Sequence, residues 1–188
     1  MRVTFDLSDS DLKYFRRVMR EVREKSKHLS EADIVAASKE LLEQMANTSV
    51  PEFVRDRVGK LDRLIEMLED EEWALSGKDR ERVVRGLAYF AEPEDMIPDK
   101  VPVLGFLDDA IMVELVVSEL EHEIEAYGDF CNFRVRRESH FGENEDPATR
   151  EEWLVSRRRQ LQQRMRRRRG RRRHRAGAGS AKGPTALW

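Results

Sequence analysis

Hydrophobic residues recur every three to four positions over most of the first 130 residues, the spacing of one face of an α-helix. The first such stretch begins at Ser8 or Ser10, either of which can cap exposed backbone amides, and ends near Lys27. A second begins at Ser30, three residues before Asp33, in a sequence that resembles a capping box. The pattern therefore predicts two amphipathic helices at the start of the chain.

Two more helices are predicted before the first dense group of prolines. The third begins at Pro51, where a missing backbone N–H has no cost, and continues to about Leu68. Gly59 in its middle lowers the helix propensity by about 1 kcal/mol. A fourth helix begins at Ser76, and Pro93 ends it.

The segment Pro93–Gly105 is rich in proline and also unusually apolar, which excludes a regular helix and predicts a structured loop. A fifth helix is predicted over residues 106–127, with Gly128 as its stop. No stretch shows a clear alternation of apolar and polar residues, the pattern typical of strands. The sequence predicts an all-α fold, a compact bundle of about five helices with a proline-rich loop, over residues 1–130.

The pattern changes after residue 130. Residues 131–147 lack an apolar period and are predicted to form a linker, and residues 148–165 are predicted to form a short helix. Residues 166–188 are predicted to be a disordered arginine-rich tail, because a run of like charges repels itself into extension.

Charge is divided unevenly along the chain. Residues 157–182 carry thirteen Arg and Lys and no Asp or Glu, which leaves 22 basic against 37 acidic side chains elsewhere. The net charge of −2 therefore combines a basic tail with a body of −15. Such asymmetry indicates a tail that binds an anionic partner or folds back on its own acidic body.

Composition narrows the class of protein further. A length of 188 residues suits one domain with an appendage. The single cysteine, Cys131, excludes an intramolecular disulfide, and the N-terminus lacks the apolar stretch of a secretory signal, so a cytoplasmic location is expected. The apolar run 101–117 is interrupted by three acidic residues, which disfavours a conventional membrane span but is compatible with a re-entrant or interfacial segment.

The segment Tyr89–Asp109 contains a distinctive series of short motifs. It has an aromatic helix end, a Pro-x-Asp, an Ile-Pro-Asp, a Pro-Val-Leu-Gly-aromatic and an Asp-Asp pair, in that order. This series resembles the signature of the YkvA-like family, a small, mainly bacterial helical domain of unknown function, over about residues 83–117. The resemblance implies a helix–loop–helix core. It adds no catalytic assignment, because none is established for the family, and the membrane association of some relatives is compatible with a place at the membrane periphery.

The motif residues have a structural interpretation that needs no ligand. The prolines fix the loop backbone, and a glycine permits a close helix approach or a positive φ. Acidic residues in turns and at a helix start bind local amides. The alternative is a divalent cation held by clustered carboxylates. The structural residues are Pro93, Pro98, Pro102 and Gly105, and the candidate metal ligands are Asp95, Asp99, Asp108 and Asp109.

Other candidate chemistry is weak. Glu119 and His122 have the Glu-x-x-His spacing of two-metal helical bundles, but the second pair of such a bundle is missing, so a solvated acidic helix face is expected. No histidine has a recognised spacing to Cys131, and no phosphate-binding glycine loop or dinucleotide fingerprint occurs. The sequence implies no cofactor and no small-molecule substrate, and it gives enzymatic activity little positive support.

Three functions therefore remain as hypotheses. The first is a non-enzymatic interaction or scaffold module that offers the Pro93–Gly105 loop to a partner protein or a membrane interface. The second is a cation-dependent protein that uses the aspartates. The third is non-specific association of the tail with nucleic acid or anionic lipid. The candidate anion-binding residues are Arg157, Arg158, Arg159, Arg164, Arg166, Arg167, Arg168, Arg169, Arg171, Arg172, Arg173 and Arg175.

Overall fold

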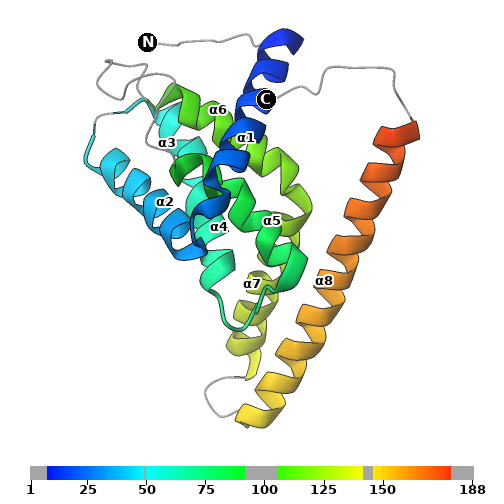
Figure 1. The fold of residues 1–188 in the computed structure, drawn as a ribbon. Coiled ribbons are helices and arrows are strands. Elements are labelled where there is room, and N and C mark those ends of the chain that lie inside the picture. Colours follow the sequence, from blue (N-terminus) through cyan, green and yellow to red (C-terminus); the bar gives the residue numbers. More distant parts are fainter. Residues whose placement is uncertain (1–7, 49, 92–105, 142–145, 179–188) are drawn as a thin grey trace. The chain divides into compact units, whose positions relative to one another are not determined.

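A computed structural model describes residues 8–48, 50–91, 106–141 and 146–178, and every regular element within these ranges is helical (Figure 1). The predicted all-α class is confirmed. The elements in chain order are α1 (Asp9–Lys25), η1 (Ser26–His28), α2 (Glu31–Ala46), α3 (Glu52–Val58), α4 (Lys60–Glu69), α5 (Gly77–Leu87), η2 (Ala88–Ala91), α6 (Leu107–Glu119), α7 (Glu121–Phe141) and α8 (Pro147–Ala178).

The first two helices begin where the sequence predicts. Ser8 caps α1 and Ser30 caps α2, and each side chain accepts a hydrogen bond from the backbone N–H three residues later, over 3.3 Å and 3.2 Å. The aspartates at those positions, Asp11 and Asp33, accept in return from the cap backbones, so both capping boxes are complete.

The third and fourth predicted helices differ from expectation in detail. Gly59 does more than weaken the third helix: it ends α3, and α4 begins at the next residue. Ser76 precedes α5 as predicted, but its side chain makes no capping hydrogen bond. The division at Gly59 and the separation of α6 from α7 explain why the described residues contain more helices than the five expected.

The chain divides into two compact units. The first comprises Met1–Glu66 and Ser76–Glu119, in which α2 and α5 pack on η2 and α3 packs on α6. Ion pairs between helices supplement this core, as between Lys60 and Glu114 at 2.8 Å. The fully or almost fully buried core side chains of this unit include Val54, Val58, Leu61, Leu64, Val83, Leu87, Met112, Val113 and Val116.

The second unit comprises Met67–Leu75 and Leu120–Trp188. Its two long helices, α7 and α8, lie side by side and antiparallel (Figure 1). Trp73 is completely buried in this unit, with its ring centroid 5.2 Å from that of Phe130 and 5.8 Å from that of Tyr127. Among the described side chains of α8, Leu154, Leu161 and Met165 are buried.

Three predictions about the C-terminal third are wrong. Gly128 does not stop a helix, because α7 continues through it to Phe141, and residues 131–141 therefore belong to a helix rather than a linker. The short helix predicted over 148–165 extends to Ala178, so residues 166–178 are helical, while residues 179–188 lie outside the described residues. The physical reason is that α7 and α8 stabilise each other through their apolar faces and their opposite charges. A prediction made for each segment separately does not include this stabilisation.

None of the helices in the described ranges combines the length and the hydropathy needed to cross a membrane.

Candidate functional site

The motif at Tyr89–Asp109 is described only at its two ends, and both are buried in the first unit. Tyr89 and Phe90 close η2 with their rings edge to face, 5.2 Å apart. Phe106 has a φ of 66°, a left-handed conformation that costs a non-glycine residue about 1–2 kcal/mol. Asp108 and Asp109 follow in the first turn of α6 and are buried, which puts both carboxylates at the positive end of the helix dipole.

The rest of the motif lies outside the described residues. This applies to Asp95 and Asp99 and to the structural residues Pro93, Pro98, Pro102 and Gly105. The cation site and the docking surface on the Pro93–Gly105 loop therefore stay predictions. Among the residues that the structure describes, no group of three or more His, Cys, Asp or Glu is placed to hold a metal ion. Glu119 of the Glu-x-x-His pair accepts a hydrogen bond from Arg23 over 3.0 Å.

The basic helix α8 faces an acidic face of α7 in the second unit. Acidic side chains spaced four residues apart on α7 meet arginines spaced four residues apart on α8, in antiparallel order. A guanidinium beside each carboxylate neutralises it, and Glu125 raises the pKa of its partner Arg168 through a hydrogen bond. The three pairs of this ladder are Glu121–Arg172 at 3.0 Å, Glu125–Arg168 at 2.5 Å and Asp129–Arg164.

A fourth pair in the same interface is buried. Arg169 donates from Nη1 to Oε1 of Glu123 over 2.8 Å, and the Glu123 side chain is only 1% exposed. The pairs of the ladder, by contrast, are between 40% and 61% exposed. Burial of a carboxylate requires a close partner, so the pair at Arg169 fixes the alignment of the two helices more strongly than the exposed ladder does.

A second polar network joins both helices to the segment before Leu75. Arg134 on α7 and Arg150 on α8 both donate to Glu72, over 2.7 Å and 2.5 Å. Burial alone would raise the pKa of the Glu72 carboxyl, but the two guanidinium groups outweigh it and lower that pKa. Tyr127 donates from its hydroxyl to Asp70 over 3.1 Å, and burial, Cys131 and Asp70 together raise the pKa of Tyr127.

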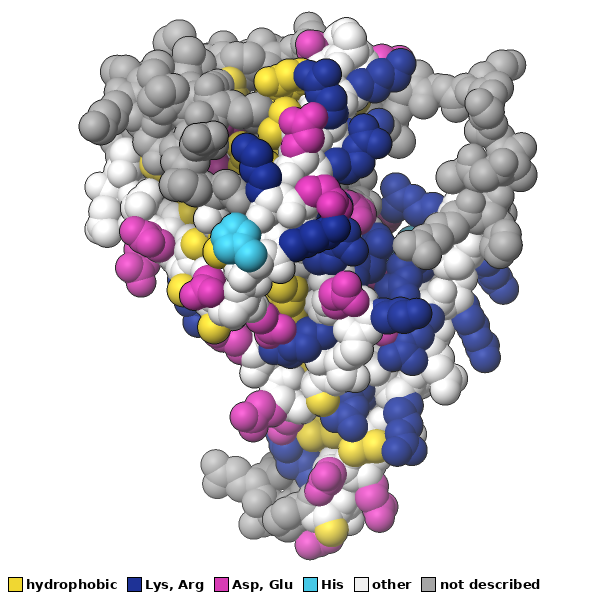
Figure 2. All heavy atoms as spheres, in the orientation of Figure 1, with side chains coloured by type: hydrophobic (Ala, Val, Ile, Leu, Met, Phe, Trp, Pro, Cys, Tyr) yellow, Lys and Arg dark blue, Asp and Glu magenta, His cyan; other side chains and the backbone are white. Residues whose placement is uncertain are grey.

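Three arginines on α8 take part in neither arrangement. Arg159, Arg167 and Arg171 are exposed, and no ion pair of theirs occurs within the described part of the chain. Figure 2 shows dark blue basic side chains along the part of the surface that α8 forms. Arg159, Arg167 and Arg171 together define what we call the outward surface of α8, which is positively charged.

The other predicted anion-binding arginines have different surroundings. Arg158 donates to the backbone carbonyl of Glu72 over 3.1 Å, and Arg157 donates to Gln160 over 2.7 Å. Arg166 is exposed and has an interaction of its own. The side chains of Arg173 and Arg175 lie outside the described residues. The sequence treats all the predicted anion-binding arginines alike. In the structure some of them contact other residues of the chain, and others are exposed.

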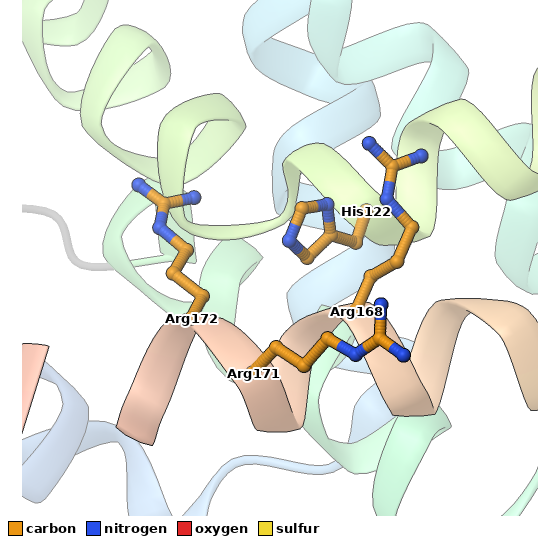
Figure 3. A pocket seen from close by; sticks show the side chains of 4 residues that line it. All are labelled: His122, Arg168, Arg171 and Arg172. Atoms are coloured by element: carbon orange, nitrogen blue, oxygen red, sulfur yellow. The ribbon is translucent and has the colours of Figure 1, made fainter. Parts of the chain in front are cut away.

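A cavity of about 360 Å³ lies between the first turn of α7 and the last described part of α8. It is lined by His122 from α7 and by Arg168, Arg171 and Arg172 from α8, with the imidazole ring between the side chains of Arg168 and Arg172 (Figure 3). Carbon atoms of these side chains make up most of the lining, and the guanidinium groups of Arg171 and Arg172 point away from one another (Figure 3). The four lining residues include no nucleophile paired with a base.

His122, Arg134 and Arg150 were not identified from the sequence as members of a basic site or a polar network. The period of four shared by Glu121, Glu125 and Asp129 is the signal that could have found the hairpin, since the arginines of the tail repeat with the same period. Read together, the two series predict an antiparallel pair of helices rather than a linker and a disordered tail.

The motif has a counterpart among known protein families. A family model described as a protein of unknown function, DUF1232, matches residues 83–115, from the second half of α5 into α6. This match supports a small domain of an uncharacterised family, and the name YkvA-like stays a prediction. No curated protein and no solved structure gives a significant match to the chain.

Proposed function

We propose that the α7–α8 hairpin is a non-enzymatic binding module that holds the phosphate backbone of nucleic acid on the outward surface of α8. The observation that carries this proposal is the exposure of Arg159, Arg167 and Arg171 without an ion pair in the described part of the chain. Exposed arginines bind phosphate through several N–H donors at once, and they gain free energy from the release of condensed counterions.

The spacing of these arginines suits a polymer. The helical rise of 1.5 Å per residue separates Arg159 from Arg171 by about 18 Å, with Arg167 between them. One strand of a duplex places a phosphate about every 3.4 Å along its axis, so several phosphates lie within that length. The helix is held by its contacts with α7, so binding orders little additional backbone.

Nucleic acid is favoured over a lipid surface by the position of the apolar residues of α8. A helix that lies in a membrane interface inserts an apolar face. Leu154, Leu161 and Met165 are buried in the second unit, and Trp153 is half-buried, with its ring centroid 5.4 Å from that of Phe133. The outward surface of α8 also lacks aromatic side chains for base stacking, so the proposed binding is non-specific in sequence and strongly dependent on salt.

The test is a salt series of fluorescence anisotropy on the full chain with a labelled 20-base-pair duplex. Three phosphate contacts predict that the logarithm of the association constant falls with the logarithm of salt concentration with a slope of about −2.7. The triple variant Arg159→Gln, Arg167→Gln and Arg171→Gln should lose most of that slope. An unchanged slope in this variant would refute the proposal.

The matched control removes the same charge elsewhere. Lys13, Arg16 and Arg20 are exposed on α1, in the first unit. Their replacement by Gln lowers the net charge by the same three units, so it should leave the slope nearly unchanged. Equal losses in both triple variants would indicate attraction by net charge alone. Vesicles of phosphatidylserine form the second arm, and tighter binding to vesicles than to the duplex would contradict the choice of nucleic acid.

A further inference from the structure

We infer that α8 lies in the major groove of B-form DNA, with Gln163 against the edges of the base pairs and arginines against the phosphates on both sides. This inference rests on the proposed function and names the groove that the outward surface of α8 enters. It starts from the position of Gln163, whose side chain is exposed and lies four residues from Arg159 and four from Arg167.

Gln163 points away from the core of the second unit. Leu161 and Met165, two residues before and two residues after it, are each only 1% exposed. An α-helix turns by about 100° per residue, so these two buried side chains lie about 160° from Gln163, one in each direction. Gln163 is therefore opposite the buried side of α8.

The arginines of the outward surface lie on both sides of Gln163. Four residues correspond to one turn plus about 40°, so Arg159 and Arg167 lie about 40° to either side of it. Arg171 lies about 80° away, on the side of Arg167. Along the helix axis, Arg159 and Arg167 are each about 6 Å from Gln163. A polar side chain without charge thus has positive charge on both flanks, the arrangement that places a base-pair edge between two phosphate strands.

The amide of Gln163 is available to a ligand. Gln160 accepts a hydrogen bond from Arg157 over 2.7 Å. Gln162 donates to the backbone carbonyl of Trp73 over 3.0 Å. The side chain of Gln163 makes no hydrogen bond to any residue that the structure describes. Its amide can both donate and accept, so it can bond to the major-groove edge of any base pair, which agrees with binding that is non-specific in sequence.

The dimensions of a helix fit the major groove of DNA. An α-helix with its side chains is about 10–12 Å across, and this groove is about 12 Å wide and 8.5 Å deep. Only the outer half of α8, about 5–6 Å, has to enter, so α7, which packs on the buried side, stays outside. The minor groove is only about 6 Å wide, and the major groove of an RNA duplex is deep and narrow. The outward surface therefore fits duplex DNA better than duplex RNA.

Fluorescence anisotropy on the full chain with three labelled 20-base-pair duplexes of one sequence tests the groove. The first is DNA, the second is DNA with glucosylated 5-hydroxymethylcytosine in place of cytosine, and the third is RNA. The glucose extends from the base into the major groove and leaves the phosphate charge unchanged. The second and third duplexes should each bind about tenfold or more weakly than the first. An affinity for either of them equal to that for plain DNA would overturn the inference.

Gln163→Ala tests the residue itself. It should weaken the binding of plain DNA about fivefold through loss of a hydrogen bond, with an unchanged salt slope because no charge is removed. Alanine and glutamine both favour a helix, so α8 should persist. The matched control is Gln44→Ala, at an exposed position of α2 in the first unit, which should leave the affinity unchanged. An unchanged affinity in Gln163→Ala would contradict the contact with the base pairs.

The inference and the proposed function fail in different ways. Equal binding of all three duplexes, with the salt slope still lost in the triple arginine variant, would remove the groove alone and leave phosphate binding by the outward surface. Absence of duplex binding would remove both.

Discussion

Replacement of Arg169 by Met tests whether the basic end of α8 is held against α7. Arg169 is the partner of Glu123, whose side chain is 1% exposed, and their nitrogen and oxygen atoms lie 2.8 Å apart. Met replaces the aliphatic part of the Arg side chain and carries no charge. The variant therefore leaves the packing nearly intact and removes the charge beside a buried carboxylate.

The expected magnitude follows from burial. Removal of one member of a buried ion pair costs about 3–5 kcal/mol, because the other charge stays buried without compensation. The Arg169 side chain is itself 20% exposed, so water can relieve part of this cost and we expect about 3 kcal/mol. The double variant Arg169→Met with Glu123→Leu should recover most of this loss, because it removes both charges.

Urea unfolding followed by tryptophan fluorescence measures this change in the free energy of unfolding in the second unit. Trp73 and Trp153, two of the three tryptophans of the chain, belong to the second unit. Arg164→Met is the control, since it breaks an exposed pair with Asp129 on the same helix and should cost only about 0–1 kcal/mol. Equal stability of Arg169→Met and the parent chain would refute the packing of residues 166–178 on α7.

Further predictions concern the core, the loss of stability at low pH and the helix caps. Trp73→Ala should destabilise the second unit by about 3–5 kcal/mol in urea unfolding followed by circular dichroism, because the indole is fully buried between aromatic rings. The lowered pKa of Glu72 means that its contribution to stability is complete above its ordinary value of 4.5 and is lost as the pH falls below it. Arg150→Gln should therefore flatten the dependence of the urea midpoint on pH below 4.5, and a curve parallel to that of the parent would count against the network. Ser30→Ala should cost about 1 kcal/mol through loss of the cap of α2, measured by thermal unfolding, with Ser76→Ala as a nearly neutral comparison because Ser76 makes no capping hydrogen bond.

The start of the fold could be predicted from the sequence because its signals are local. Ser8 and Ser30 each meet an aspartate three residues later, and a capping box requires nothing from the rest of the chain. Gly59 was recognised as a weak point for the same reason, although its effect was underestimated: a Cβ built at this position would lie 3.1 Å from the carbonyl oxygen of Arg55. Local propensity therefore marks Gly59 as a weak point but does not predict that the helix ends there.

The hairpin could not be predicted in this way because its stability is not local. A run such as Arg166 to Arg169 repels itself in isolation, and only the acidic face of α7 reverses that preference. The same dependence hid the cavity, since His122 and Arg171 are 49 positions apart in the chain and line one cavity only when the helices align. The sequence contained both charge series, but their pairing required the antiparallel alignment of the two helices.

The acidic face of α7 has two effects on the proposed anion binding. It makes α8 a stable helix, and it also competes with any ligand for the inward arginines, Arg164, Arg168 and Arg172. A carboxylate tethered to the same chain has a high effective concentration, so a dissolved phosphate displaces it only at a cost. The arginines that remain for a polymer are those that point away from α7. The charge of α8 is thus divided by geometry: the inward arginines stabilise the fold, and under the proposed function the outward ones determine the affinity and the salt dependence of nucleic-acid binding.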